Sequence, residues 1–155
     1  MSNRLKCAGR LNELLESNFL IAKCFRKIKK STKKEDLQRF FQKKASKRYQ
    51  FAIELSEEIG YLKEAYCSYG PFSASKKKLW VVPEQDFTRH LKTIIRNDKK
   101  ILKEYRNAMA EINEAPTREI IIRHAAIIEK DLFELRALKK KIQLQQKSEP
   151  DLQTL

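Results

Sequence analysis

Residues 40–55 read FFQKKASKRYQFAIEL, and the rest of the chain can be organised around this stretch because it carries an arginine in the middle of an apolar helical face. Apolar side chains around it recur in steps of three and four, which places them on one side of a helix. They are Leu37, Phe41, Ala45, Phe51, Ala52, Leu55, Ile59 and Leu62. Lys44 and Arg48 fall on the same side, where an isolated charge is costly to bury. Arg48 therefore needs opposite charges inside the protein or a path to water.

Working outward, the same amphipathic spacing predicts four helices, at residues 4–30, 35–63, 85–113 and 117–145. The turn at residues 31–34 is short, so the first two helices should form an antiparallel hairpin. Ala115-Pro116 breaks the pattern between the last two, and Thr117 is the expected cap of the fourth helix. A long connection at residues 64–85 lies between the hairpins. The sequence predicts an all-α four-helix bundle.

Composition fits one domain of long helices. The 155 residues include only three Gly and four Pro, so we expect a single bundle domain at residues 1–145 and a flexible tail at 146–155. No apolar run is long enough to span a membrane, and a cytoplasmic protein is expected. The odd number of cysteines, Cys7, Cys24 and Cys67, without CxxC spacing, indicates free thiols rather than a disulfide framework or a zinc site.

Polar residues interrupt the apolar stripes at one height. Counting residues from the two turns places Asn18, Arg48, Asp98 and Asp131 near mid-bundle, where a guanidinium and two carboxylates can satisfy one another. The sequence thus predicts a buried polar network of these four residues. Two alternatives stay open: the charged side chains reach water at the edge of the stripe, or Asp98, Asp131 and His124 bind a metal such as di-iron or di-manganese.

The formal net charge is +14. A crossover between the second and third helices would make those helices parallel and gather lysines at one end of the bundle, a basic pole. Its members are Lys27, Lys29, Lys30, Lys33, Lys34, Lys76, Lys77, Lys78, Lys139, Lys140 and Lys141. Such a pole suits weak, salt-sensitive nucleic-acid binding, or it only solvates the protein.

No catalytic motif stands out. The chain has no Gly-rich phosphate loop and no GxSxG, and both histidines, His90 and His124, lie on or near apolar stripes, as core histidines do. The long connection carries Phe72 and Trp80, which we expect to pack against the bundle. Together with Val81 and Val82 they offer a surface for a homodimer.

Several of these features resemble a known family. The start Leu11–Glu16 (LNELLE), the pair Phe40-Phe41 followed by Arg48-x-x-Phe51-Ala52-x-Glu54-Leu55, Trp80 and Tyr105 look like uncharacterised bacterial ferritin-like domains of unknown function related to rubrerythrin. The resemblance spans residues 8–142. It implies a ferritin-like four-helix bundle with a long crossover between helices 2 and 3.

The chain departs from that pattern at metal-site positions. It has Leu20 and Ala22 where acidic residues are expected, Leu132 where relatives can show a histidine, and no Glu-x-x-His in its second or fourth helix. The resemblance therefore implies a bundle without a functional di-metal centre, in which Arg48 stands as a fixed cation in place of a metal. A non-enzymatic structural, interaction or stress-associated role follows. The alternatives are a di-metal oxidoreductase or storage protein and a basic nucleic-acid-binding module.

Overall fold

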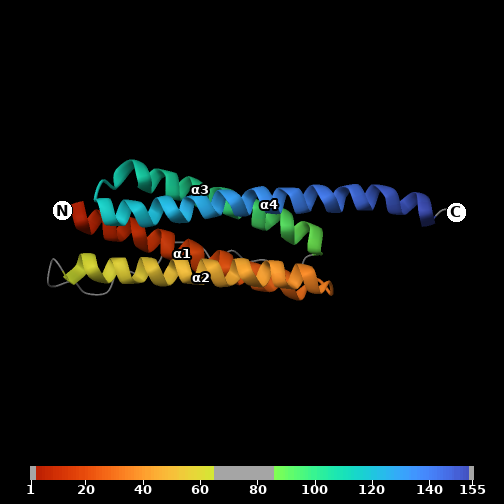
Figure 1. Ribbon diagram of the computed structural model, residues 1–155, viewed down its shortest axis with the longest axis horizontal. Helices are drawn as coiled ribbons and strands as arrows, with labels where there is room; N and C mark the ends of the chain where they lie inside the picture. The colour runs from red at the N-terminus through yellow and green to blue at the C-terminus, as the bar shows by residue number, and fades with distance from the viewer. Residues whose placement is uncertain (1–2, 65–85, 154–155) are drawn as a thin grey trace.

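Four long α-helices make up the part of the chain that the computed structural model describes, residues 3–64 and 86–153 (Figure 1). They are α1 (Asn3–Lys30), α2 (Glu35–Glu64), α3 (Phe87–Glu111) and α4 (Ala115–Gln153). Within these residues no strand occurs. The predicted all-α four-helix bundle is confirmed.

The order and direction of the helices follow from contacts between their ends. Phe41 near the start of α2 packs on Phe87 at the start of α3, with ring centroids 5.9 Å apart. Arg10 near the start of α1 bonds Glu111 at the end of α3. α2 and α3 therefore run in the same direction, antiparallel to α1 and α4, as Figure 1 shows. The predicted crossover topology is confirmed, although residues 65–85 of the connection lie outside the described residues.

Side chains and turns define the helix ends. Asp86 caps α3, since its carboxylate accepts a hydrogen bond from the Arg89 backbone at 2.8 Å. At the other end of α3, Arg118 donates to the carbonyl oxygens of Met109 and Ile112. These carbonyls have no partner within the helix, so Arg118 stabilises the end of α3 and its junction with α4.

α4 differs from the prediction at both ends. It begins at Ala115, so Pro116 lies in the first turn, where its missing N–H is not needed. Thr117 is not the cap: its hydroxyl donates to Glu58 at 2.6 Å. The helix continues past the expected end near Gln145 to Gln153. Residues 137–147 (ALKKKIQLQQK), which include the start of this extension, are strong helix formers even where the apolar period fades. A flexible tail at 146–155, separate from the bundle domain, stays a prediction.

The core lies along the axis and is built by all four helices. It includes Leu14, Phe25, Phe51, Ile94 and Ile128, each with no exposed surface. Phe25 and Phe41 lie stacked with ring centroids 6.4 Å apart. None of the described helices is long and apolar enough to cross a membrane. Polar side chains interrupt this core near its middle, and they form the candidate site.

Candidate functional site

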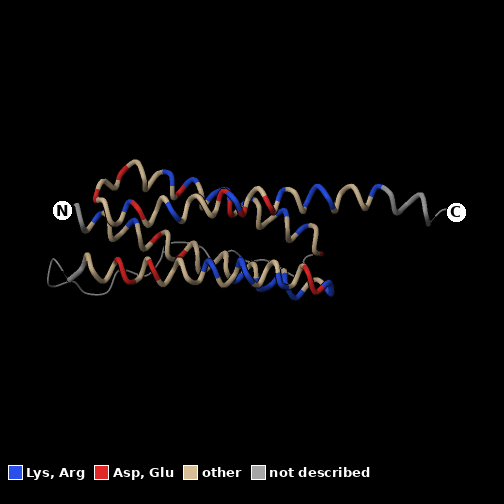
Figure 2. The backbone as a smooth tube through the Cα atoms, in the orientation of Figure 1, with Lys and Arg blue, Asp and Glu red and all other residues tan. Residues whose placement is uncertain are grey.

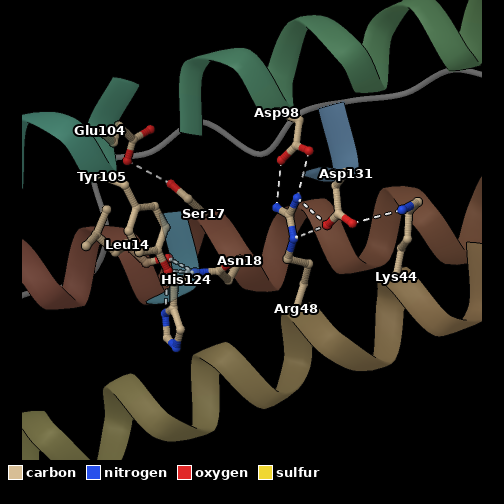
Figure 3. Close-up of polar contacts among 10 residues, drawn as sticks. All are labelled: Leu14, Ser17, Asn18, Lys44, Arg48, Asp98, Glu104, Tyr105, His124 and Asp131. Carbon is tan, nitrogen blue, oxygen red and sulfur yellow. Dashed lines mark hydrogen bonds and ion pairs between the residues drawn. The ribbon is translucent and has the colours of Figure 1, made fainter. Parts of the chain in front are cut away.

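Arg48 of α2 is completely buried and binds aspartates from two other helices (Figure 3). Its Nη1 and Nη2 donate to the two carboxylate oxygens of Asp98 in α3, at 2.6 and 2.7 Å. Its Nε and Nη2 both donate to Oδ2 of Asp131 in α4, at 3.2 and 2.9 Å. The arrangement is a charge-assisted, bidentate pair with Asp98 plus a second ion pair with Asp131.

Lys44 extends this cluster by one helical turn. Its Nζ donates to Asp131 Oδ1 at 2.8 Å and to Glu134 Oε2 at 3.0 Å, and Lys44 itself is only 6% exposed. We call Lys44, Arg48, Asp98 and Asp131 the ion-pair centre. The charges of its two cations and two carboxylates cancel one another. Lys44 was not predicted as a member, although its place on the apolar stripe four residues before Arg48 was a signal for it.

Aromatic rings complete the surroundings of the two cations. The Phe25 ring lies 5.7 Å from the Arg48 guanidinium carbon, and the Phe40 ring lies 4.5 Å from Lys44 Nζ. Both distances suit cation–π attraction, which replaces some of the lost hydration. The carboxylates and the aromatic rings together therefore offset the free-energy cost of burying these charges.

Burial and pairing act in opposite directions on the charged groups. Burial alone would lower the pKa of Arg48, but the charges and hydrogen bonds of Asp98 and Asp131 outweigh it and raise that pKa. Burial also raises the pKa of Asp98, and Arg48 opposes that shift. The bidentate contact uses both oxygens of Asp98 as acceptors, which requires the ionised carboxylate. We conclude that both partners are charged.

Asn18, predicted to belong with Arg48, lies in a different cluster. Its Nδ2 donates to the Leu14 carbonyl at 2.9 Å and to the Tyr105 hydroxyl at 2.7 Å, while its Oδ1 has no partner. The predicted single four-residue network is therefore wrong in this member. Counting residues from the turns gives the height of Asn18 but not the side toward which its short amide can reach.

The second cluster continues from Tyr105 to the surface. His124 Nδ1 lies 2.9 Å from the Tyr105 hydroxyl, and its Nε2 lies 2.7 Å from Glu54 Oε2. Glu54 also bonds Arg123, and the Phe51 ring stacks on His124 at 3.8 Å between centroids. Asn18, Tyr105, His124 and Glu54 thus form one hydrogen-bonded chain, the tyrosine–histidine chain, which leads from the interior to a partly exposed carboxylate.

Protonation in this chain follows from burial. Burial lowers the pKa of His124 to about 4, more than the nearby Glu54 raises it, so the ring is neutral near pH 7. Burial raises the pKa of Tyr105, which stays protonated. For Glu54, hydrogen bonds from Arg123 and His124 outweigh burial and lower the pKa. The consistent assignment has His124 donating from Nε2 to Glu54 and accepting the Tyr105 proton at Nδ1.

The predicted metal candidates do not come together. Asp98 and Asp131 bind Arg48, whereas His124 bonds Tyr105 and Glu54. Among residues 3–64 and 86–153, no group of three or more His, Cys, Asp or Glu is placed to hold a metal ion. Arg48 and Lys44 together already occupy both carboxylate oxygens of Asp98 and of Asp131. The donor set at mid-bundle therefore does not fit a di-iron or di-manganese centre.

The predicted basic pole lies at the end of the bundle where α1 turns into α2 (Figure 2). Lys34 in that turn and Lys141 of α4 line the same surface pocket, so lysines of the two segments are neighbours. The last turn of α1 carries Lys27, Lys29 and Lys30. Lys76, Lys77 and Lys78 lie outside the described residues, as do Phe72, Trp80 and Cys67. Cys7 and Cys24 are free and buried, and burial raises the pKa of each thiol to about 11.

Comparisons with known proteins place the chain in a family. A family model described as a domain of unknown function (DUF2383) matches residues 6–111. No curated protein matches the sequence. Among solved structures, the fold is similar to the DPS protein from Vibrio cholerae O1, described as a member of a broad superfamily of ferritin-like diiron-carboxylate proteins. That match has a TM-score of 0.72 and 18% identity, and it covers 88% of this chain and 90% of the other. The chain is thus a ferritin-like four-helix bundle, and it belongs to the uncharacterised DUF2383 family.

Proposed function

We propose that this protein is a ferritin-like bundle with no di-metal centre at mid-bundle, and that it serves as a non-enzymatic structural or interaction protein. One observation carries the proposal. The Arg48 guanidinium lies between Asp98 and Asp131, where it supplies from the chain itself the positive charge that these carboxylates need.

Electrostatics favour this reading over metal binding. Lys44 brings a second cation against Asp131, so a divalent ion at the same place would meet two positive charges at hydrogen-bonding distance from its ligands. Repulsion between like charges at such distances in a buried site is large. Arg48 is then a fixed cation in place of a metal, and its role is structural.

The alternative is a di-iron or di-manganese oxidoreductase or storage protein. Its support is the fold, which is similar to that of a protein described as a ferritin-like diiron-carboxylate family member. Fold alone does not carry an activity. A stress-associated role, a cytoplasmic location and a homodimer remain predictions from the sequence.

Metal analysis separates the two functions. The protein is purified without chelator from cells grown with added iron and manganese, and its metal content is measured by mass spectrometry together with oxidation of added ferrous iron. We expect well below one metal ion per chain and no oxidation above the buffer rate. Asp131→Asn is the control, since it removes one carboxylate while keeping a hydrogen-bonding side chain. Stoichiometric iron or manganese that this variant loses would overturn the proposal.

A further inference from the structure

The outer side of α3 carries a continuous line of cations. Counting at 100° per residue, positions 92, 96, 99, 103 and 106 fall on one face of the helix. Figure 2 shows Lys and Arg recurring along α3. These residues are Lys92, Arg96, Lys99, Lys103 and Arg106, all exposed. They extend over about 21 Å of helix at 1.5 Å per residue. No acidic residue of α3 shares this face.

Most of these cations have no acidic partner. Within the described part of the chain, Lys92, Arg96, Lys99 and Lys103 make no ion pair, whereas Arg106 pairs with Glu129 at 2.6 Å. A structural role in pairing with neighbouring helices therefore accounts for Arg106 but not for the other four. Unpaired cations in a row form a track of positive potential that attracts a chain of phosphates.

A groove beside this line holds an exposed aromatic ring. α3 and α4 pack against each other, and between them lies a surface groove of about 350 Å³. Its charged lining residues are Lys99, Arg136 and the paired Arg106 and Glu129, and Phe133 lies among them. Phe133 is 75% exposed, so the core does not explain its presence. Arg136 follows Phe133 by three residues on α4, is exposed and forms no ion pair in the described residues. The groove thus combines cations from both helices with a large apolar ring open to solvent.

From this combination we infer that the α3–α4 groove binds single-stranded nucleic acid. The phosphates lie along Lys92, Arg96, Lys99 and Lys103, and a base stacks on Phe133. An accessible aromatic beside a cationic track is the arrangement by which proteins hold unpaired bases without reading their sequence. The site differs from the basic pole, which has lysines but no described exposed aromatic ring. The inference does not depend on what the bundle interior holds.

Double-stranded nucleic acid and anionic membranes fit this groove less well. In a duplex the bases are stacked on one another, which leaves Phe133 without a partner. A membrane-binding helix presents a broad apolar face beside its cations. Here Phe133 is one ring among charged neighbours, and the face of α3 is cationic along its length.

The test measures binding of a fluorescein-labelled 20-nucleotide oligo-dT to the full chain by fluorescence anisotropy. We expect saturable binding. A plot of the logarithm of the association constant against the logarithm of the salt concentration should have a slope of about −3, as for roughly four phosphate contacts on a single strand. The triple variant Lys92→Gln/Lys99→Gln/Lys103→Gln should lose on the order of tenfold or more in affinity. The control Lys30→Gln/Lys33→Gln/Lys34→Gln changes net charge equally at the basic pole and should lose less than about threefold.

Phe133→Ala tests the stacking contact. We expect a loss of on the order of fivefold or more for oligo-dT, and retention of binding in Phe133→Trp. Tyr61→Ala removes an equally exposed ring from α2 and should have no effect. All of these positions are exposed, so circular dichroism should show folded protein throughout.

The inference is overturned if the two lysine triples weaken binding equally, if Phe133→Ala binds oligo-dT as the unaltered protein does, or if oligo-dT does not bind. A duplex of the same length, or vesicles containing anionic lipid, bound more tightly than oligo-dT would assign the groove to that partner instead.

Discussion

The guanidinium of Arg48 and the carboxylate of Asp98 meet across the bundle interior in a two-point contact, Nη1 to Oδ1 at 2.6 Å and Nη2 to Oδ2 at 2.7 Å. Neither side chain has exposed surface. Buried pairs of this kind contribute little compared with an apolar core, but removal of one partner strands a charge.

The Arg48→Ala variant should therefore be strongly destabilised, by about 3–5 kcal/mol, because Asp98 would stay buried without its cation. Urea unfolding followed by circular dichroism measures the change. Lys43→Ala removes an exposed cation from the same helix and should change stability by less than about 0.5 kcal/mol. Equal midpoints for the two variants would contradict the role assigned to Arg48.

Replacing the whole centre with apolar residues should be far milder. In the triple variant Arg48→Met/Asp98→Leu/Asp131→Leu, Lys44 keeps Glu134, which is partly exposed, so no buried charge is left alone. We expect a free energy of unfolding within about 1–2 kcal/mol of the unaltered protein, or above it. A triple variant as unstable as Arg48→Ala would show that packing around the cluster, rather than charge, sets the cost.

Tyr105→Phe tests the tyrosine–histidine chain. The change leaves His124 Nδ1 without its donor and takes from Asn18 Nδ2 one of its two acceptors, at a cost of about 1–3 kcal/mol. Tyr61→Phe, at a position 78% exposed, is the matched control and should be neutral. The difference in unfolding free energy between the two variants measures the net contribution of the tyrosine–histidine chain to stability. No difference would mean that its hydrogen bonds make no net contribution.

Stability should depend on pH through His124. Its folded pKa, lowered by burial to about 4, lies below the value of about 6.5 in an unfolded chain. Between these values the unfolded state binds more protons. The contribution of His124 to stability is therefore fully present above about pH 6.5 and is lost as the pH falls toward 4. His90, whose pKa burial also lowers, acts in the same direction.

Urea unfolding at about pH 5 and about pH 7 compares the unaltered protein with His124→Gln. The variant should lose much of the difference in unfolding free energy between the two pH values, since His90 is then the one histidine left to titrate in that range. An unchanged difference would mean that His124 is protonated to the same extent in both states.

Three of the four residues of the ion-pair centre could be predicted from the sequence. Arg48, Asp98 and Asp131 break apolar stripes at matching distances from the turns, and the structure brings these three together. The sequence does not distinguish a Lys44 with a buried ammonium group from one whose ammonium group reaches water, since its long aliphatic stem permits either. Asn18 was misplaced because its hydrogen-bond partner, Tyr105, reads in the sequence as an ordinary core aromatic.

The amino-acid sequence by itself determined four amphipathic helices and their approximate ends, because periodicity and turns are local properties of the chain. The long connection has room for either direction of the third helix, and contacts between helix ends in the folded bundle decide it. Tertiary structure alone decided which polar atoms meet. Hydrogen bonds act over about 3 Å, and helix rotation and packing set distances on that scale. Arg48 was therefore evident from the sequence as a charge that needed partners, and the folded bundle determined that they are Asp98 and Asp131, with Lys44 beside them.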